Sequence, residues 1–257
     1  MKNLFTQQFG TGNPVVLIHG FCETHEIWNE IAKALSLQYK VFIIDLPAFG
    51  QSSLPITPFS LNTIGQIVLD WIKQNNIVRP TVIGHSLGGY VALEMALQSK
   101  DIFSAIGLFH STAFPDSEEK KANRNRVIEF VKKNGAHPFI ETFVPGLFYS
   151  KEDPAIPMVY GIAHKTHSEA ITAYSAAMRD RPSYVEVLKN FNAPVLLLGG
   201  DNDPIIPQEV MLQMSQLAKH PVYKILKTTG HMAMYEQFDQ AKEVLFDFLQ
   251  QPIFRGK

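Results

Sequence analysis

The sequence predicts an α/β fold in which helices cover both faces of a mostly parallel sheet. Short, nearly continuous apolar runs recur along the 257 residues, and each run is typical of a strand that is buried on both faces. Stretches in which apolar residues return at helical spacing separate most of these runs. This alternation of strand and helix is what a parallel sheet with helical crossovers requires.

The apolar runs that we expect to form strands lie at residues 15–18, 41–44, 81–83, 105–109, 195–198 and 222–226. Helical spacing marks the segments between them. The clearest helical stripes are Ile27, Ile31, Ala34 and Leu35; Ile64, Ile67, Val68, Trp71 and Ile72; and Val91, Ala92, Met95 and Ala96. A last stripe, with Val244, Leu245, Phe248 and Leu249, falls within residues 241–249.

Residues 114–183 interrupt this alternation. They contain charged helical signals over 116–133, prolines at 154 and 157, and many aromatic residues and methionines, without a clear buried strand. An insertion of this length between two core strands is usually functional, so we expect a helical lid, the alternative being a structural flank. The predicted organisation is a first core part at 1–113, a helical lid or cap at 114–183 and a second core part at 184–257.

The composition favours a soluble globular protein, because 46% of the residues are apolar and 18% are charged. A formal net charge of -1 gives no electrostatic reason to expect binding to nucleic acid or to an anionic membrane. The single cysteine, Cys22, excludes an internal disulfide and favours a reducing compartment. Residues 1–12 lack the apolar core of a signal peptide, and no run approaches the ~20 apolar residues of a membrane span. We therefore expect a cytoplasmic protein.

The segment that carries the clearest chemistry is residues 82–89, Val-Ile-Gly-His-Ser-Leu-Gly-Gly. A strand that runs through Gly-x-Ser-x-Gly into a helix is typical of a nucleophile elbow, in which a sharp turn exposes the serine Oγ. Gly84 and Gly88 lie where a Cβ would meet the neighbouring strand or helix. A serine that merely caps the following helix is the alternative, but a cap does not require both glycines.

A serine hydroxyl needs a base and an anion-stabilising pocket. In a parallel sheet, the loops at the carboxyl ends of the strands converge on one crevice. Besides Ser86, these loops carry His19 after 15–18, Asp201 and Asp203 after 195–198, and His231 after 222–226. The order along the chain is therefore Ser, Asp, His.

With these motifs the chain resembles the α/β-hydrolase superfamily, and in particular its small lidded esterase-like members. The resemblance runs from His19-Gly20-Phe21 to His231 and includes residues 45–53, Asp-Leu-Pro-Ala-Phe-Gly-Gln-Ser-Ser, which match the family's turn after its next strand. It implies the α/β-hydrolase fold and a mechanism with Ser86 as nucleophile, Asp203 as acid and His231 as base. The family pattern Gly-x-x-Asp maps Gly200 onto Asp203, which leaves Asp201 as a solvated turn residue.

The oxyanion hole is expected at two backbone N–H groups. One is that of Leu87, the residue after the nucleophile, at the start of a helix. The family match points to Phe21 for the other, so that His19 and Gly20 shape the turn. Cys22 lacks a base and acid of its own and is expected at most at the pocket mouth.

The remaining histidines are expected to have structural roles. His85 is expected to point away from the Ser86 hydroxyl and to pack under the turn, and His110 is expected in the core or the pocket wall. His164 and His167 are three residues apart, but no third ligand is evident, so no metal site is expected. The sequence contains no common Gly-rich phosphate loop, and no cofactor is expected.

Apolar side chains, mostly in the lid, are candidates for the substrate pocket, although more than half of them are expected only to pack the lid onto the sheet. They are Trp28, Phe114, Phe130, Phe139, Phe143, Phe148, Met158, Met178 and Met232. A pocket of this kind suits a small or medium apolar group. Near the end of the lid, Arg179, Asp180 and Arg181 are expected to form a structural ion pair rather than to bind a carboxylate.

These observations predict a serine hydrolase that cleaves a small or medium, largely apolar carboxylic ester, lactone or thioester. Two alternatives stay open: a lyase or carbon–carbon bond hydrolase that uses the same three residues, and a ligand-binding receptor with vestigial hydrolysis. The expected partner is a small molecule, with no nucleic acid and no membrane, and the protein is expected to be a monomer or a homodimer.

Overall fold

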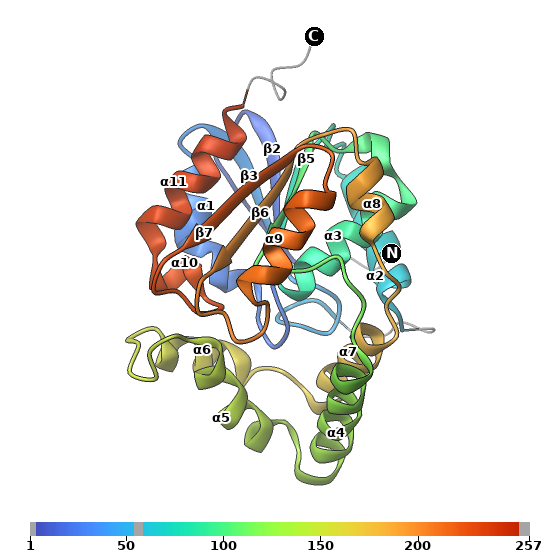
Figure 1. The fold of residues 1–257 in the computed structure, drawn as a ribbon, viewed down its shortest axis with the longest axis vertical. Coiled ribbons are helices and arrows are strands. Elements are labelled where there is room, and N and C mark those ends of the chain that lie inside the picture. Colours follow the sequence, from blue (N-terminus) through green and yellow to red (C-terminus); the bar gives the residue numbers. More distant parts are fainter. Residues whose placement is uncertain (1–3, 54–58, 252–257) are drawn as a thin grey trace.

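The computed structural model describes residues 4–53 and 59–251, and its centre is a seven-stranded sheet (Figure 1). The strands lie in the order β1-β3-β2-β4-β5-β6-β7. Only β1 runs antiparallel to its neighbour, β3, and every other pair is parallel. The strands are β1 (Thr6–Phe9), β2 (Asn13–Ile18), β3 (Tyr39–Ile44), β4 (Thr81–His85), β5 (Ala105–Phe109), β6 (Val195–Gly200) and β7 (Pro221–Leu226).

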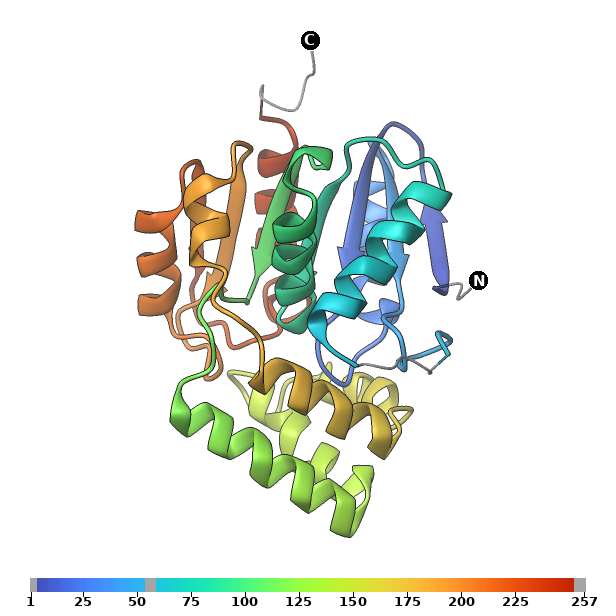
Figure 2. The same ribbon diagram turned by 90° about the vertical axis from the view of Figure 1, so that its right-hand side faces the viewer.

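Helices cover both faces of this sheet, as the views of Figures 1 and 2 show. On one face α1 packs against α11, and on the other α2 and α8 pack against α3. The core helices are α1 (Asn29–Leu35), α2 (Leu61–Gln74), α3 (Leu87–Gln98), α8 (Val185–Asn190), α9 (Gln208–Leu217), α10 (Ala233–Glu236) and α11 (Phe238–Leu249), with 3-10 turns at His25–Trp28 and Lys100–Ile102. The predicted α/β-hydrolase fold, a mostly parallel sheet flanked by helices, is thereby confirmed.

The six predicted strands are β2 to β7. The central residues of β2 to β6 are buried because helices cover the sheet on both sides, whereas β7 lies at an edge of the sheet and is only partly buried, which corrects the expectation for that strand. The sequence analysis did not predict β1. Its residues, Thr-Gln-Gln-Phe, form an edge strand that is not an apolar run, and only its pairing with β3 identifies it.

Four helices between β5 and β6 form a separate layer below the carboxyl ends of the strands (Figures 1 and 2). They are α4 (Glu118–Asn134), α5 (Ala136–Leu147), α6 (Ile156–Ala163) and α7 (Ser168–Arg179), and we call them the helical insertion. Inside this layer α4 packs along α7, and α5 packs against α4 and α6. The insertion therefore covers the edge of the sheet at which the candidate catalytic loops emerge.

Local sequence explains where α4 begins and ends. The Ser117 hydroxyl accepts a hydrogen bond from the N–H of Lys120 at 3.2 Å, which caps the first turn. Glutamates at 118 and 119 lie in the first turn of the helix and lysines at 132 and 133 in the last, where their charges interact favourably with the helix dipole. Gly135, with φ of +82°, then turns the chain into α5.

Within residues 4–53 and 59–251, no helix combines the length and the apolar character needed to cross a membrane.

Candidate active site

Ser86 stands at a sharp turn between β4 and α3. Its φ of +48° and ψ of -111° are a strained conformation for a residue with a side chain. The turn is held by the N–H of Ser86, which donates to the carbonyl of Phe109 at 2.9 Å, and by the hydroxyl of Ser111, which donates to the Ser86 carbonyl at 2.7 Å. This is the geometry of a nucleophile elbow.

The glycines around the elbow allow the chain to approach itself closely. A Cβ on Gly84 would overlap the backbone of Gly88, and a Cβ on Gly88 would overlap the carbonyl oxygen of Ile18 in β2. These are the collisions with helix and strand that the sequence analysis anticipated. The turn therefore excludes side chains at both positions.

The structure brings Asp203 and His231 together from the loops after β6 and β7. The Nδ1 atom of His231 lies 2.8 Å from Oδ2 and 3.0 Å from Oδ1 of Asp203, and both side chains are buried. Asp201 takes a different place, where its carboxylate accepts hydrogen bonds from Asn202 and from the N–H of Thr229. Because Nδ1 of His231 donates to the carboxylate, its Nε2 is left free to act as a base.

The carboxylate of Asp203 accepts hydrogen bonds from four residues. Besides His231, these come from Nδ1 of His110 at 2.7 Å and from the N–H groups of Ile205 and Ile206 at 2.8 and 2.9 Å. Burial by itself would raise the pKa of the Asp203 carboxyl, but the two histidines lower that pKa well below its usual range. The carboxylate therefore stays ionised at every pH at which the protein would work.

The bond between His110 and Asp203 is a feature that the sequence analysis missed. His110 follows the carboxyl end of β5, and β5 lies directly beside β6. That position next to the Asp203 loop could have predicted the contact. Burial lowers the pKa of His110 to about 4, against the opposing effect of Asp203. His110 is consequently neutral near pH 7 and donates to the carboxylate through its Nδ1–H.

His110, Asp203 and His231 are also close enough to share a metal ion, since one ligand atom of each lies within 4.8 Å of the others. However, Nδ1 of each histidine lies within hydrogen-bond distance of the carboxylate and must carry a proton there. The hydrogen-bonded arrangement thus explains this cluster without a metal. Elsewhere, His164 pairs with Glu141 at 3.1 Å and stacks on His137.

A buried ion pair lies beneath the elbow and connects three of the loops. Nδ1 of His85 lies 2.9 Å from Oε2 of Glu23, and Nε2 of His85 lies 2.9 Å from the carbonyl oxygen of His231. Burial alone would lower the pKa of His85, but the Glu23 carboxylate raises it, and the same pairing lowers the pKa of Glu23. Both ring nitrogens of His85 face these acceptors and point away from the Ser86 hydroxyl, as expected, so that the side chain ties the Glu23 loop to the His231 loop.

The two expected oxyanion donors lie at the same edge. Leu87 is the first residue of α3, and the first N–H groups of a helix have no acceptor inside it. The N–H of Phe21 likewise makes no hydrogen bond to any residue that the structure describes. The loop of Phe21 is fixed by His19, whose Nδ1 donates to the Gly20 carbonyl at 2.7 Å and whose Nε2 accepts from the N–H of Leu46 at 2.9 Å.

Ser86 and His231 line one cavity of about 280 Å³ between the sheet and the helical insertion. Its apolar wall includes Phe21, Val127, Phe139, Phe143, Leu147, Met178, Pro204 and Ile205. Of the nine apolar side chains proposed from the sequence for the substrate pocket, the structure places Phe139, Phe143 and Met178 in this wall.

The other six do not line the cavity. Trp28, Phe148 and Met232 are buried in the core, where the Trp28 ring packs on that of Phe109. Phe114 is partly buried against the core, while Phe130 and Met158 are 44% and 50% exposed on the outside of the insertion. These six positions are corrected: the sequence marked them as apolar but could not tell which apolar side chains meet the cavity.

The cavity also has a polar end, although most of its lining is apolar as the sequence predicts. Tyr90, Asp116, Lys120, Asn123 and Arg124 line it, and all but Tyr90 belong to α4 or the residues just before it. In the sequence, the charged residues of this helix were indistinguishable from a solvated face.

Comparison with known proteins agrees with this fold. The model of the alpha/beta hydrolase family matches residues 15–247. Among solved structures, a thermophilic esterase from Thermogutta terrifontis superposes with a TM-score of 0.90 at 26% identity, over 96% of this chain and 93% of that one. The "Uncharacterized hydrolase YugF" of Bacillus subtilis is 24% identical over 92% of this chain and 89% of its own length.

A further relative is the (E)-2-((N-methylformamido)methylene)succinate hydrolase of Acinetobacter baylyi, 26% identical over 87% of this chain and 85% of its own length. Since the family model covers most of the chain, the protein belongs to the alpha/beta hydrolase family.

Proposed function

We propose that this protein is a serine hydrolase that cleaves carboxylic esters through an acyl-enzyme on Ser86, with His231 as general base and Asp203 as orienting acid. One observation carries the proposal. Nδ1 of His231 is committed to Asp203 at 2.8 Å, so Nε2 is the free nitrogen, and His231 lines the same cavity as Ser86.

In this mechanism Nε2 of His231 takes the hydroxyl proton while Oγ of Ser86 attacks the ester carbonyl carbon. The oxygen of that carbonyl becomes an anion that the N–H groups of Phe21 and Leu87 stabilise. When the tetrahedral intermediate collapses, the bond to the alcohol breaks and the proton on His231 passes to the alcohol. Water then repeats the sequence on the acyl-enzyme, which releases the acid and regenerates Ser86.

Asp203 supports this cycle as a fixed anion. It orients the imidazole and stabilises the positive charge that His231 acquires after it takes the proton. The hydrogen bonds from His110, Ile205 and Ile206 hold the carboxylate so that it does not rotate when the charge on His231 changes.

The cavity favours small substrates, because its volume of about 280 Å³ lies near the lower limit of common ligand pockets, roughly 300 Å³. The aromatic rings of Phe139 and Phe143 stack on each other in its wall and suit a short apolar stretch of acyl group. Esterase and hydrolase are also the activities named for the relatives, among them a pimeloyl-[acyl-carrier protein] methyl ester esterase of Vibrio cholerae.

The test is hydrolysis of p-nitrophenyl esters of increasing chain length by the wild type and by matched variants. Ser86→Ala is expected to lower kcat by several orders of magnitude while its melting temperature stays close to that of the wild type, and Asp203→Asn is expected to lower kcat by about 10³- to 10⁴-fold. Asp201→Asn is the matched control, since Asp201 makes no contact with His231, and we expect close to wild-type turnover. Full turnover by Ser86→Ala, or equal losses from the two aspartate variants, would refute the assignment.

A further inference from the structure

The polar end of the cavity is rich in positive charge. Lys120 and Arg124 line it one helical turn apart on α4, with Asn123 between them. Residues four apart on a helix lie on the same face, so the two cationic side chains point to the same region of the cavity. Ser86 and His231 line this cavity too, which places the charges within reach of one small molecule bound at the serine.

The nearest acid does not neutralise this region. Asp116 pairs with Nε of Arg124 at 3.1 Å and with Nη1 of Arg181 at 2.8 Å, so one carboxylate faces two guanidinium groups. Arg181 is further fixed by the carbonyls of Met178 and Phe114 and by its position over the Tyr90 ring. Arg124, by contrast, uses only Nε within the described residues, and its terminal nitrogens have no partner there.

Lys120 has no acidic partner among the residues that the structure describes. Its Nζ has one acceptor, the carbonyl oxygen of Ile205 at 3.4 Å, although an ammonium group has three hydrogens to donate. Ile205 also lines the cavity, so this contact holds the ammonium at the cavity wall. Lys120 is exposed at the mouth of the cavity, but partial desolvation of its ammonium lowers its pKa, and the guanidinium groups of Arg181 and Arg124 add to that effect against Asp116 and Asp203.

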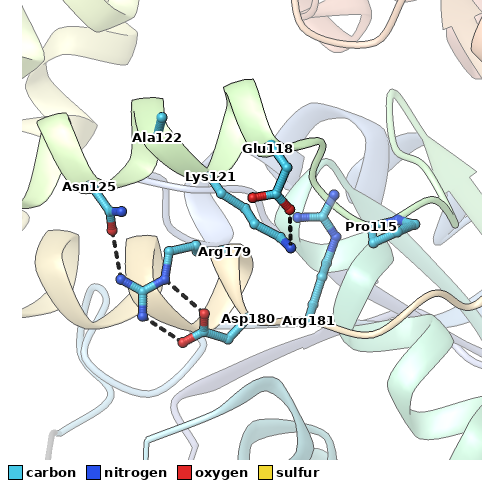
Figure 3. Close-up of a pocket in the computed structure, with 8 residues that line it drawn as sticks. All are labelled: Pro115, Glu118, Lys121, Ala122, Asn125, Arg179, Asp180 and Arg181. Atoms are coloured by element: carbon cyan, nitrogen blue, oxygen red, sulfur yellow. Dashed lines mark hydrogen bonds and ion pairs between the residues drawn. The ribbon is translucent and has the colours of Figure 1, made fainter.

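In a neighbouring surface depression, by contrast, two basic residues are matched by acids. There, Lys121 pairs with Glu118 at 2.8 Å, and Arg179 is held by Asp180 and Asn125 at 2.7 Å each (Figure 3). Arg179 and Asp180 form the structural ion pair that the sequence predicted. Lys120 and Lys121 are adjacent in sequence, yet only Lys121 is matched by an acid.

We propose that the cavity binds an ester that also carries a free carboxylate, which Lys120 and Arg124 hold while Ser86 attacks the ester carbonyl. The substrate class is the half-ester of a short dicarboxylic acid or a molecule with the same two groups. The proposal rests on the proposed serine-hydrolase function. The apolar wall then contacts the short carbon chain between the ester and the carboxylate. The carboxylate accepts hydrogen bonds from the Lys120 and Arg124 donors that have no partner in the described residues.

The experiment compares matched substrates by titration of the acid released. Monomethyl succinate, glutarate and adipate are set against the methyl esters of butanoate, pentanoate and hexanoate, and 3-acetoxypropionate against propyl acetate. A carboxylate held by two cations is expected to raise kcat/KM by about 10- to 100-fold over the neutral ester. The first set places the carboxylate on the acyl side of the ester and the second places it on the alcohol side.

Lys120→Met tests the ammonium and Lys121→Met is its matched control. In Lys120→Met the preference for the charged ester is expected to fall by about 10-fold or more, and Lys120→Arg is expected to restore part of it. Lys121→Met is expected to keep the wild-type preference. Melting temperatures of all three variants show whether each is folded.

Binding of glutarate to the Ser86→Ala variant, measured by calorimetry, separates this proposal from the proposed function. Binding that is lost in the Ser86→Ala, Lys120→Met double variant supports the carboxylate site even where no ester is hydrolysed. Hydrolysis of neutral esters with no preference for charged ones, and no binding of glutarate, overturns the carboxylate site and leaves the hydrolase standing. Failure of both hydrolysis and binding overturns both.

Discussion

The N–H of His231 donates a hydrogen bond to the carbonyl oxygen of Leu147 at 2.7 Å. This bond joins the candidate base to the end of α5 in the helical insertion. Gly230, the residue before the histidine, approaches the same segment so closely that a Cβ there would meet the backbone from Leu147 to Tyr149. The insertion therefore supports the histidine loop in addition to covering the cavity.

Glu236 joins the same two segments through its carboxylate. It accepts hydrogen bonds from the N–H of Tyr149 at 2.7 Å, of Met232 at 2.9 Å and of Gly230 at 3.1 Å. Burial raises the pKa of Glu236 in spite of these bonds. Three backbone N–H groups, two of them on the residues that flank His231, thus depend on the side chain of Glu236.

We predict that Glu236→Ala lowers both stability and turnover. The variant leaves these donors without their acceptor, which costs about 1–3 kcal/mol, and the melting temperature should fall by about 3–10 °C. Because His231 then loses part of its support, kcat on a p-nitrophenyl ester should fall more than KM rises.

Glu243→Ala is the control for this prediction, because Glu243 is an exposed residue of α11. It should change neither quantity appreciably. A Glu236→Ala variant with wild-type kcat would show that the histidine loop holds its place without the carboxylate.

His110 makes the stability of the protein depend on pH. Its pKa is about 4 in the folded protein, while an exposed histidine has a pKa of about 6.5. Between these values the unfolded chain binds a proton that the folded protein does not, so the free energy of unfolding falls as the pH falls from about 6.5 to about 4. This one residue should contribute up to about 3 kcal/mol to that loss.

Urea unfolding at a series of pH values checks this prediction in the wild type and in His110→Asn. Asparagine keeps an N–H donor near the position of Nδ1 for Asp203 but does not titrate. Its free energy of unfolding should therefore decline less steeply below pH ~6.5. Parallel curves for the two proteins would mean that His110 does not bind a proton on unfolding.

The elbow glycines give a prediction about stability alone. Gly84→Ala places a Cβ against the backbone of Gly88, which cannot move aside as a flexible side chain would. We expect a loss of at least about 3 kcal/mol, seen as a melting temperature lower by about 6 °C or more, or as failure to fold.

Gly161→Ala is the matched control, since it lies in α6 with nothing within 4 Å of its added Cβ. It should stabilise the protein by up to about 1 kcal/mol, because alanine favours helix more than glycine does. Equal melting temperatures for Gly84→Ala and the wild type would contradict the steric account of the elbow.

The parts of the fold that could be predicted are those with a strong local signal. Buried parallel strands require continuous apolar runs, so β2 to β6 were visible in the sequence. The apolar residues within 222–226 also revealed β7, although this edge strand is only partly buried. The elbow was visible because its backbone requires glycine at two fixed positions around Ser86. The edge strand β1 was not, because an edge strand exposed to water needs no apolar run.

What the sequence could not provide is the direction of side chains in the helical insertion. Phe139 and Phe143 line the cavity while Phe130 faces solvent, and all three lie on amphipathic helical segments. Lys120 and Lys121 differ in the same way: one faces the cavity and the other pairs with Glu118. These differences arise from how the insertion packs on the sheet, which is a long-range property.

The measurement that tests the central claim most directly is covalent labelling with a fluorophosphonate, followed by intact mass and peptide mapping. A live nucleophile at the elbow predicts one adduct per chain, on Ser86, and a labelling rate about a hundredfold lower or more in His231→Ala. No adduct on Ser86, or labelling of His231→Ala at the wild-type rate, would contradict the account.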